Sequence, residues 1–370
     1  MALADRVKLY SELEALRKRP LLVYVTSPRE GAGGQMSADV IPEICDQLEA
    51  LPANTEGVDL LLVSNGGDPM VALRIVTLIR ERVDKFAVFV PQAAYSAATL
   101  LALGADEIIM HPNGNLGPVD PQIVMRDKDG RETSFGFEDM HGFLEYVRKE
   151  VGLTDQEHVR AMLEMFCRQF SPAFVGKAAR SALLSQSLGA KLLLTHLPED
   201  DKQRSRRIVE ALNKSYYHHG YPINRDEARL NELPVAKEGE QTQVEGLIWR
   251  IWRDVEDEFE FRKPFDPTFV LMQSPQGQQI LAPVPQLNVP ANTPDPVVQQ
   301  IFAQLIANAI QPINPVAFAV TPVIVESLRR ASCYRLRGTV LACRMPNLNI
   351  QSNVIFTAKG WELTPLPDVA

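Results

Sequence analysis

The sequence predicts an α/β protein built on a parallel sheet. Two segments repeat the same order: an apolar strand, a turn of small residues, and a helix with apolar positions at helical spacing. They span residues 58–83 and 85–103, and the strand-like run ADEIIM follows at 105–110. Repeated strand–helix–strand units of this kind place their strands side by side in one parallel sheet.

The segments before this core also show helix and strand patterns. Residues 4–19 form a charged amphipathic helix, residues 21–27 form a strand, and Ser37 begins a further helix. The glycine-rich loop at 30–36 lies between the last two. Met36 stands where a dinucleotide loop has its third glycine, and no Gly-Lys-Ser/Thr follows. We therefore expect a flexible loop at the rim of a substrate groove and no phosphate site.

Ser96 is the candidate nucleophile. It opens an apolar helix soon after the strand at 85–90, so its hydroxyl would lie beside unpaired N–H groups and the positive end of the helix dipole. The amide of Ala97 would then be a candidate oxyanion donor. Gly66 and Gly67, in the turn of the first unit, can adopt positive φ. Their amides would then be exposed to the peptide or acyl carbonyl that Ser96 attacks. Each feature alone also fits close packing in an ordinary turn.

Three motifs in a fixed order resemble the ClpP/crotonase superfamily of serine peptidases. They are SNGG at 64–67, AYSAATLLALGADEI at 94–108 and HPNGNLGPVDP at 111–121. The position of the ClpP histidine falls at Asp120, and the position of its acid falls near His219. This exchange, with LGPVDPQ at 116–122 and H-x-YPI at 219–223, resembles the serine dehydrogenase proteinase family. The resemblance covers about residues 20–235.

The resemblance implies a ClpP/crotonase-like core with a helical insertion, and a serine endopeptidase. It implies that Ser96 is the nucleophile, that His219 is the general base, and that Asp120 orients the imidazole. Hydrogen bonding among the members defines such a triad, and their order along the chain does not. His218 is the alternative base if the loop register differs by one residue. Asp120, before a proline, and His219, in a polar loop, also fit ordinary surface turns.

Three other functions are compatible with the sequence. A Ser-Lys peptidase of the same fold would use Lys177, which lies in an apolar segment where an unpaired ammonium would be desolvated, unless the side chain reaches solvent. An acyl-CoA enzyme of crotonase type would use the same oxyanion geometry, but it needs an adenine-nucleotide pocket that no motif identifies. A catalytically inert scaffold would bind peptides and leave Ser96 unreactive.

Composition limits the partners. The net charge of −8 and the pI near 5.4 give no electrostatic sign of a site for nucleic acid or an anionic membrane, so the composition disfavours both as partners. The four cysteines lack metal-ligand spacing, so we expect neither metal nor cofactor. No signal peptide or long apolar run is present, which predicts a cytoplasmic protein without a membrane span. The expected partners are a peptide or protein substrate and, by resemblance, further copies of the chain.

The chain divides into four predicted parts. The first is the peptidase domain, which has a loop or hairpin after residue 121 and several helices from 138 to 217 as its insertion. A docking helix with an apolar stripe follows, then a proline-rich linker with a helix. A small α+β module for assembly or substrate recruitment ends the chain. The predicted bounds are 1–235, 236–262, 263–316 and 317–370.

Overall fold

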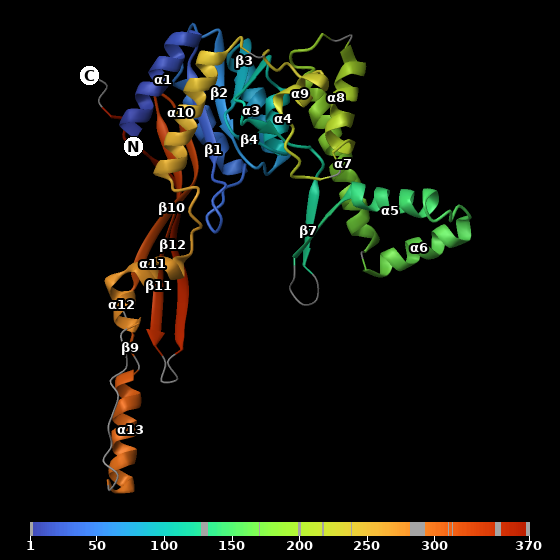
Figure 1. Cartoon of the computed structure of the whole chain (residues 1–370). Helices are drawn as coiled ribbons and strands as arrows, with labels where there is room; N and C mark the ends of the chain where they lie inside the picture. Colours follow the sequence, from blue (N-terminus) through green and yellow to red (C-terminus); the bar gives the residue numbers. More distant parts are fainter. Residues whose placement is uncertain are drawn as a thin grey trace.

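A sheet of eight described strands forms the centre of the protein (Figure 1). The computed structural model describes residues 3–126, 132–169, 171–198, 201–216, 218–237, 239–281, 293–309, 311–312, 314–344 and 349–367. Four strands run parallel and lie next to one another in chain order. They are β1 (Leu21–Thr26), β2 (Gly57–Val63), β3 (Lys85–Val90) and β5 (Glu107–Met110). These are the strands that the sequence predicts, and the α/β class is confirmed.

Helices cover both faces of the parallel strands. One face packs against α2 (Ile41–Glu49), α3 (Pro69–Arg82), α4 (Ala97–Leu103), α7 (Pro172–Leu193) and α8 (Lys202–Lys214). The other face packs against α1 (Leu3–Arg17) and α10 (Thr242–Glu258). Because side chains alternate along a strand, Leu60 and Leu62 of β2 join the first core while Leu61 and Val63 join the second. The body therefore has three layers, with the sheet in the middle.

The apolar stripe predicted for residues 236–262 lies on α10 and is buried within the chain. Ile248, Ile251, Trp252 and Val255 pack against α1 and the second face of the sheet. Two short helices complete the body: η1 (Ala38–Val40) leads into α2, and α9 (Arg225–Leu230) follows the loop after α8. Within the described ranges, none of the helices combines the length and apolar character needed to cross a lipid bilayer.

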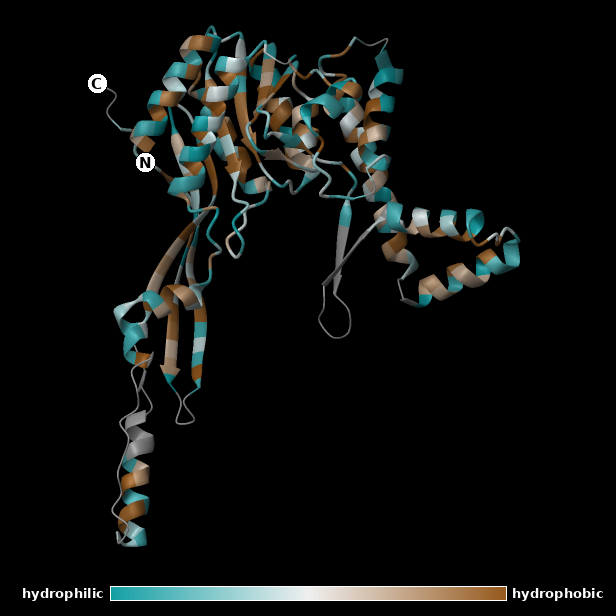
Figure 2. Ribbon diagram, viewed as in Figure 1, coloured by the Kyte–Doolittle hydropathy of each residue, from teal (hydrophilic) through white to brown (hydrophobic). Residues whose placement is uncertain are grey.

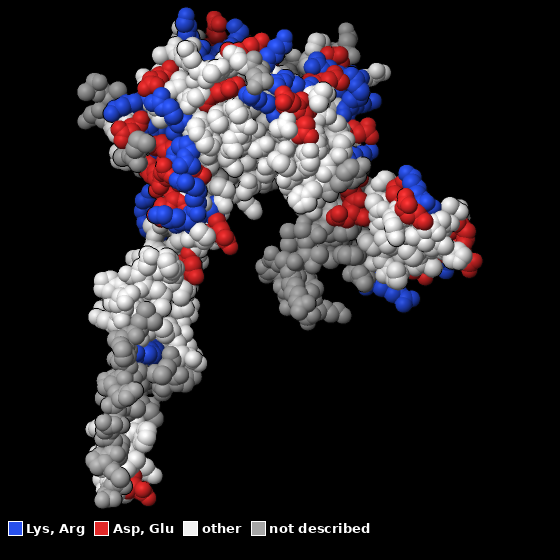
Figure 3. All heavy atoms as spheres, viewed as in Figure 1, with Lys and Arg blue, Asp and Glu red and all other residues white. Residues whose placement is uncertain are grey.

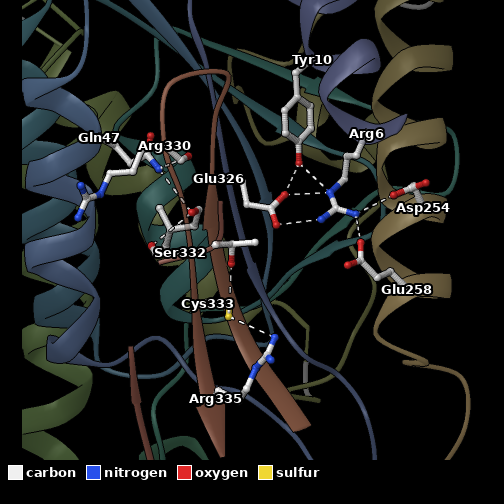
Figure 4. Close-up of polar contacts among 12 residues, drawn as sticks. Arg6, Tyr10, Gln47, Asp254, Glu258, Glu326, Arg330, Ser332, Cys333 and Arg335 are labelled. Atoms are coloured by element: carbon white, nitrogen blue, oxygen red, sulfur yellow. Dashed lines mark hydrogen bonds and ion pairs between the residues drawn. The ribbon is translucent and has the colours of Figure 1, made fainter. Parts of the chain in front are cut away.

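A buried ionic cluster joins the two ends of the chain (Figure 4). Arg6 of α1 contacts Glu326 at 2.9 Å and Asp254 of α10 at 2.7 Å, and it also pairs with Glu258. The Tyr10 hydroxyl donates to Glu326 at 2.7 Å. One guanidinium thus lies among three carboxylates, and Arg6, Tyr10, Asp254 and Glu326 are almost fully buried. Removal of the cation from such a cluster strongly destabilises the folded state, because the buried carboxylates lose their partner.

The strands of the predicted C-terminal module form part of the central sheet. They are β10 (Val316–Glu326), β11 (Ala331–Arg344) and β12 (Ile350–Leu363), and β9 (Gln311–Pro312) pairs with β11. The end of β10 pairs antiparallel with β1, so that Val23 lies opposite Glu326. The described residues of 317–370 contain strands and no helix. In its described residues, the region predicted as a small α+β module consists of strands that join the central sheet, since β10 completes the free edge of β1.

Two limbs project from the body (Figure 1). The first holds the hairpin of β7 (Gln122–Arg126) and β8 (Glu132–Gly136), then α5 (Phe137–Lys149) and α6 (Gln156–Gln169). The second, which we name the arm, comprises residues 264–281, 293–309, 316–320, 336–344 and 350–359. Its helices are α11 (Pro267–Gln273), α12 (Pro275–Leu281) and α13 (Asp295–Ala309). The region 263–316, predicted as a proline-rich linker with one helix, contains these three helices, while its residues 282–292, 310 and 313 lie outside the described residues.

Candidate active site

Ser96 occupies a strained turn at the start of a buried helix. Its φ is 54° and its ψ is −115°, and it caps α4. Positive φ is rare and costly for a residue with a Cβ, so the surrounding structure must hold Ser96 in this conformation. The short strand β4 (Ala93–Ala94) leads into the turn, and every residue of α4 is buried behind it. The half-buried Ser96 hydroxyl makes no hydrogen bond within the part of the chain that the structure describes.

The glycine turn lies directly against Ser96. Gly66 has φ +100°, and a Cβ there would lie 2.8 Å from the Tyr95 carbonyl oxygen and 3.0 Å from the Ser96 Cβ. Only glycine therefore allows this approach. The Gly66 amide donates to the Ser64 hydroxyl at 3.0 Å. Among the described residues, the amides of Gly67 and Ala97 have no acceptor, which leaves these two as the candidate oxyanion donors.

Met36, at the end of the glycine-rich loop, pairs with the same turn. Its amide donates to the Gly66 carbonyl at 2.8 Å, and its carbonyl accepts from Asp68 at 2.9 Å. A Cβ on Gly67 would lie 2.2 Å from the Met36 carbonyl oxygen. One side of the turn is therefore already occupied by the chain itself, and the side that faces Ser96 is left open.

Asp120 and His219 are brought together by two loops. Asp120 follows β6 (Asn115–Leu116), and His219 follows α8. The His219 Nδ1 lies 2.9 Å from the Asp120 Oδ1, and Gln122 donates to the other carboxylate oxygen at 2.8 Å. The hydrogen bond with Asp120 raises the pKa of His219 above its ordinary value, although burial of the ring opposes the shift. With Nδ1 held in this way, the Nε2 atom is the one left to exchange protons.

Two buried hydroxyls hold the loop that carries Asp120. Ser185 of α7 donates to the Val119 carbonyl at 2.5 Å, and the Val119 amide donates to the Leu212 carbonyl at 3.1 Å. Thr99 of α4 accepts from the Gly117 amide at 3.0 Å, so the helix that begins after Ser96 is tied to the same loop. The sequence analysis did not identify Ser185 or Thr99, because no local pattern marks a hydroxyl that bonds to a distant carbonyl.

A cavity of about 730 Å³ lies beside the Asp120–His219 pair. It lies between the start of the first limb and the end of α8. Asp120, Gln122, Gly136, Asn213, Tyr216, His218 and His219 are among its lining residues, and Ser96 is not. The structure thus brings together two of the three predicted triad residues, and it forms no hydrogen bond between Ser96 and His219.

The predicted alternatives lie in less favourable surroundings. His218 is exposed, and its Nδ1 accepts from the Gly220 amide at 3.0 Å. Lys177 is exposed on α7, whereas the base of a Ser-Lys dyad has to be desolvated. Across the described ranges, no group of three or more His, Cys, Asp or Glu side chains is arranged to hold a metal ion.

Comparison with known proteins identifies the first part of the chain. Residues 41–128 match the family model of ClpP-like SDH-type serine proteinases. This segment belongs to that family. The predicted family is therefore confirmed over the SDH-type segment, which contains the glycine turn, Ser96, Ala97 and Asp120 and ends before His219.

Two archaeal proteins are similar to short stretches of the chain. Both are uncharacterized proteins of Methanocaldococcus jannaschii. One is 42% identical over 66 residues, which is 18% of this chain and 23% of the relative. The other is 40% identical over 81 residues, which is 22% of this chain and 28% of the relative. The matches thus span about a quarter of the length of these relatives.

Solved structures with some similarity include proteases and a hydratase. A mutant of the membrane-bound stomatin-specific protease 1510-N has a TM-score of 0.34 and 16% identity, over 61% of this chain and 84% of that one. Another mutant of that protease, in complex with a substrate peptide, has a TM-score of 0.25 and 21% identity, over 35% of this chain and 58% of that one. An enoyl-CoA hydratase from Mycobacterium smegmatis has a TM-score of 0.22 and 14% identity, over 54% of this chain and 92% of that one.

Proposed function

We propose that this chain is a serine peptidase that hydrolyses peptide bonds through an acyl-enzyme on Ser96. The observation that carries the proposal is the hydrogen bond between Asp120 and His219, in a chain whose residues 41–128 are of the SDH-type proteinase family. The two residues come from separate loops, and each lies in a motif that resembles that family. The strained turn at Ser96 supports the same assignment, because such turns occur at catalytic nucleophiles.

In the proposed reaction, the Ser96 hydroxyl attacks the carbonyl carbon of the scissile bond. The Nε2 atom of His219 takes the hydroxyl proton and later gives it to the leaving amine, while Asp120 stabilises the imidazolium. The amides of Gly67 and Ala97 donate to the oxyanion. Water then attacks the acyl-enzyme, with His219 again as the base, and releases the acid product and free Ser96.

The mechanism requires a contact that the unbound chain does not make. His219 Nε2 must come within about 3 Å of the Ser96 hydroxyl when substrate is bound. Catalytic hydrogen bonds are often long in unbound enzymes and shorten in the substrate complex, so the loop that carries His219 has to close toward Ser96. We expect an extended peptide to pair with the side of the glycine turn that faces Ser96, by the strand addition that many peptide-binding proteins use.

Hydrolysis of an unfolded protein substrate tests the proposal against its alternatives. The wild type and the single variants Ser96→Ala, His219→Ala and Lys177→Ala are compared by mass spectrometry of the products. Cleavage that is lost in the first two variants and retained in Lys177→Ala supports the triad. Cleavage lost with Lys177 and retained without His219 would assign a Ser-Lys dyad, while turnover of an acyl-CoA ester without peptide cleavage would assign a crotonase-type enzyme. Peptide binding without any turnover would leave an inert scaffold.

A further inference from the structure

The arm carries very few charged side chains. From residue 264 to residue 328 the sequence contains no lysine or arginine, whereas charged residues make up 23% of the whole chain. Figure 3 shows the contrast: blue and red atoms gather along the top and left of the body and occur on the first limb, while the visible described surface of the arm shows only a few of them. A surface of this composition resembles the core of a protein–protein interface, where charged residues are depleted.

Three of the arm's five charged residues, Asp266, Arg337 and Arg344, are engaged within the chain, while Asp295 and Lys359 are exposed. Asp266 caps α11 through the Thr268 amide at 2.7 Å, and Arg337 pairs with Glu362. Arg344 is buried, and it donates to the Ile280 carbonyl at 2.9 Å. These groups are therefore already used in holding the arm together, and they do not form a charged patch that would recognise a charged partner.

Large apolar side chains of the arm are exposed to solvent. Phe302 of α13 is 54% exposed and Phe356 of β12 is 60% exposed, and Phe269, Val297 and Ile355 are exposed as well. The arm does have a small core of its own around Phe318 and Leu271, and of those five residues Phe356 contacts its edge through the Phe318 ring, at 5.8 Å between ring centroids. Figure 2 shows hydrophobic residues along the described length of the arm. Several large apolar side chains exposed on one projecting part of a protein point to an interaction site.

Helix α13 and strand β12 both lack part of the support that such elements need. α13 has 15 residues, and an isolated helix of that length is only marginally stable in water. Its apolar residues Val297 and Phe302 face solvent. β12 is the last strand of the sheet in the described part of the chain, so its outer edge offers unpaired backbone groups. A partner that covers the apolar residues of α13 and adds a strand at the outer edge of β12 would supply the missing support.

We propose that the arm is the contact surface of a homodimer, in which the arm of a second copy of this chain lies alongside it. The partner has to present an apolar, nearly uncharged surface of matching extent, and no other stretch of this chain of comparable length carries so few charged residues. A second arm supplies this surface, and two β12 strands related by a twofold axis can pair antiparallel across it. Obligate dimers of this apolar kind bury about 2,000 Å² or more in total.

Other partners fit the arm less well. Segments that bind membrane surfaces combine apolar residues with a face rich in Lys and Arg, and the arm has only Arg337, Arg344 and Lys359. Nucleic acid requires a basic surface as well. The proposal does not depend on the peptidase assignment, since it uses no residue of the candidate active site.

Sedimentation of the full chain over a concentration series tests the proposal. We expect the wild type to be a dimer, and Phe302→Asp and Phe356→Asp each to raise the dissociation constant by about tenfold or more, because a charge is placed in the interface. The two residues lie on different elements, so misfolding of one variant would not explain both results. Leu230→Asp is the matched control, since Leu230 is an exposed apolar residue of α9, outside the arm, and this variant should dimerise like the wild type.

Hydrogen exchange supplies a second measurement. The amides of residues 350–359 should exchange more slowly at concentrations where the dimer forms, and the Phe302→Asp variant should lose this protection. A wild type that stays monomeric at every concentration, or arm variants that dimerise as well as the wild type, would overturn the proposal. Flotation of monomeric wild type with vesicles of uncharged phosphatidylcholine, lost in both arm variants, would also overturn it and assign the arm to a membrane surface.

Discussion

The Nδ1 atom of His219 lies 2.9 Å from the Oδ1 atom of Asp120, although 99 residues separate the two in the sequence. This hydrogen bond favours the protonated imidazole and fixes which ring nitrogen faces the carboxylate. It therefore affects both the pKa of His219 and the ability of its other nitrogen to act as a base.

The first prediction concerns pH. Because the pKa of His219 in the folded chain lies above its ordinary value of 6.5, the stabilisation from the charged pair is complete below that value. It is lost as pH rises through the folded pKa. The proposed base is active only when neutral, so kcat/KM should rise with pH through the same raised pKa.

Replacement of the Asp120 carboxylate tests whether its hydrogen bond controls the pKa of His219. Asp120→Asn should move the rise in kcat/KM to lower pH and reduce kcat by roughly 10³–10⁴-fold, because the amide no longer favours the correct tautomer or stabilises the imidazolium. NMR titration of the His219 ring in both proteins measures the pKa directly. An unchanged His219 pKa in the variant would show that the pair does not control the base.

The second prediction concerns the glycine turn. Gly66→Ala should lower the free energy of unfolding by about 1–3 kcal/mol, because the site has φ +100°. The variant should also lose activity, since its Cβ would displace Ser96 or Ala97. Gly176→Ala is the control, because at that helical site in α7 the added Cβ would meet no neighbouring atom within 4 Å. This variant should raise the free energy of unfolding by about 0.5–1 kcal/mol. Urea unfolding of the two variants checks the difference, and equal stabilities would contradict it.

The third prediction concerns Ser185, which holds the loop before Asp120. Ser185→Ala leaves the Val119 carbonyl buried without its donor, which should cost about 1–3 kcal/mol of stability. Because Asp120 would then be less well positioned, kcat should fall by up to about 100-fold while KM changes little. Ser187→Ala, on the exposed side of the same helix, should change neither quantity. If the two variants have the same kcat, Ser185 is structural only.

The local pattern of the sequence predicts the parallel core and the turn at Ser96. Alternating and continuous apolar runs mark strands and helices, and the small residues around Ser96 and Gly66 mark the two turns. The motifs identify Asp120 and His219 as candidates, but only the folded loops bring them to hydrogen-bonding distance. That contact depends on the chain between them and has no local signature.

Long-range pairing explains what sequence analysis could not predict. The strand pattern near residue 320 does not reveal that β10 pairs with β1, about 300 residues earlier, because a strand's periodicity shows its faces and not its partner. Arg6 is a similar case. In the sequence it is one charge of an amphipathic helix, yet it is buried against Glu326 and Asp254, which lie far along the chain.

The fourth prediction concerns that buried cluster. Arg6→Leu should lower the free energy of unfolding by about 3–5 kcal/mol, because it leaves Asp254, Glu258 and Glu326 without their shared cation. Lys8→Leu, on the same helix, removes only an exposed contact with Asp5 and should change stability by less than about 1 kcal/mol. Thermal unfolding of both variants measures the difference. A small effect of Arg6→Leu would mean that the cluster does not hold the two ends of the chain together.

Covalent labelling of Ser96 tests the central proposal most directly. The wild type is treated with a fluorophosphonate at neutral pH and mapped by peptide mass spectrometry, beside Ser96→Ala, His219→Ala and Lys177→Ala. We predict labelling at Ser96 in the wild type and in the Lys177 variant, and none in the His219 variant, because only a serine activated by its base reacts with the probe. A folded wild type that is not labelled at Ser96, or one whose labelling persists without His219, would contradict the proposed triad.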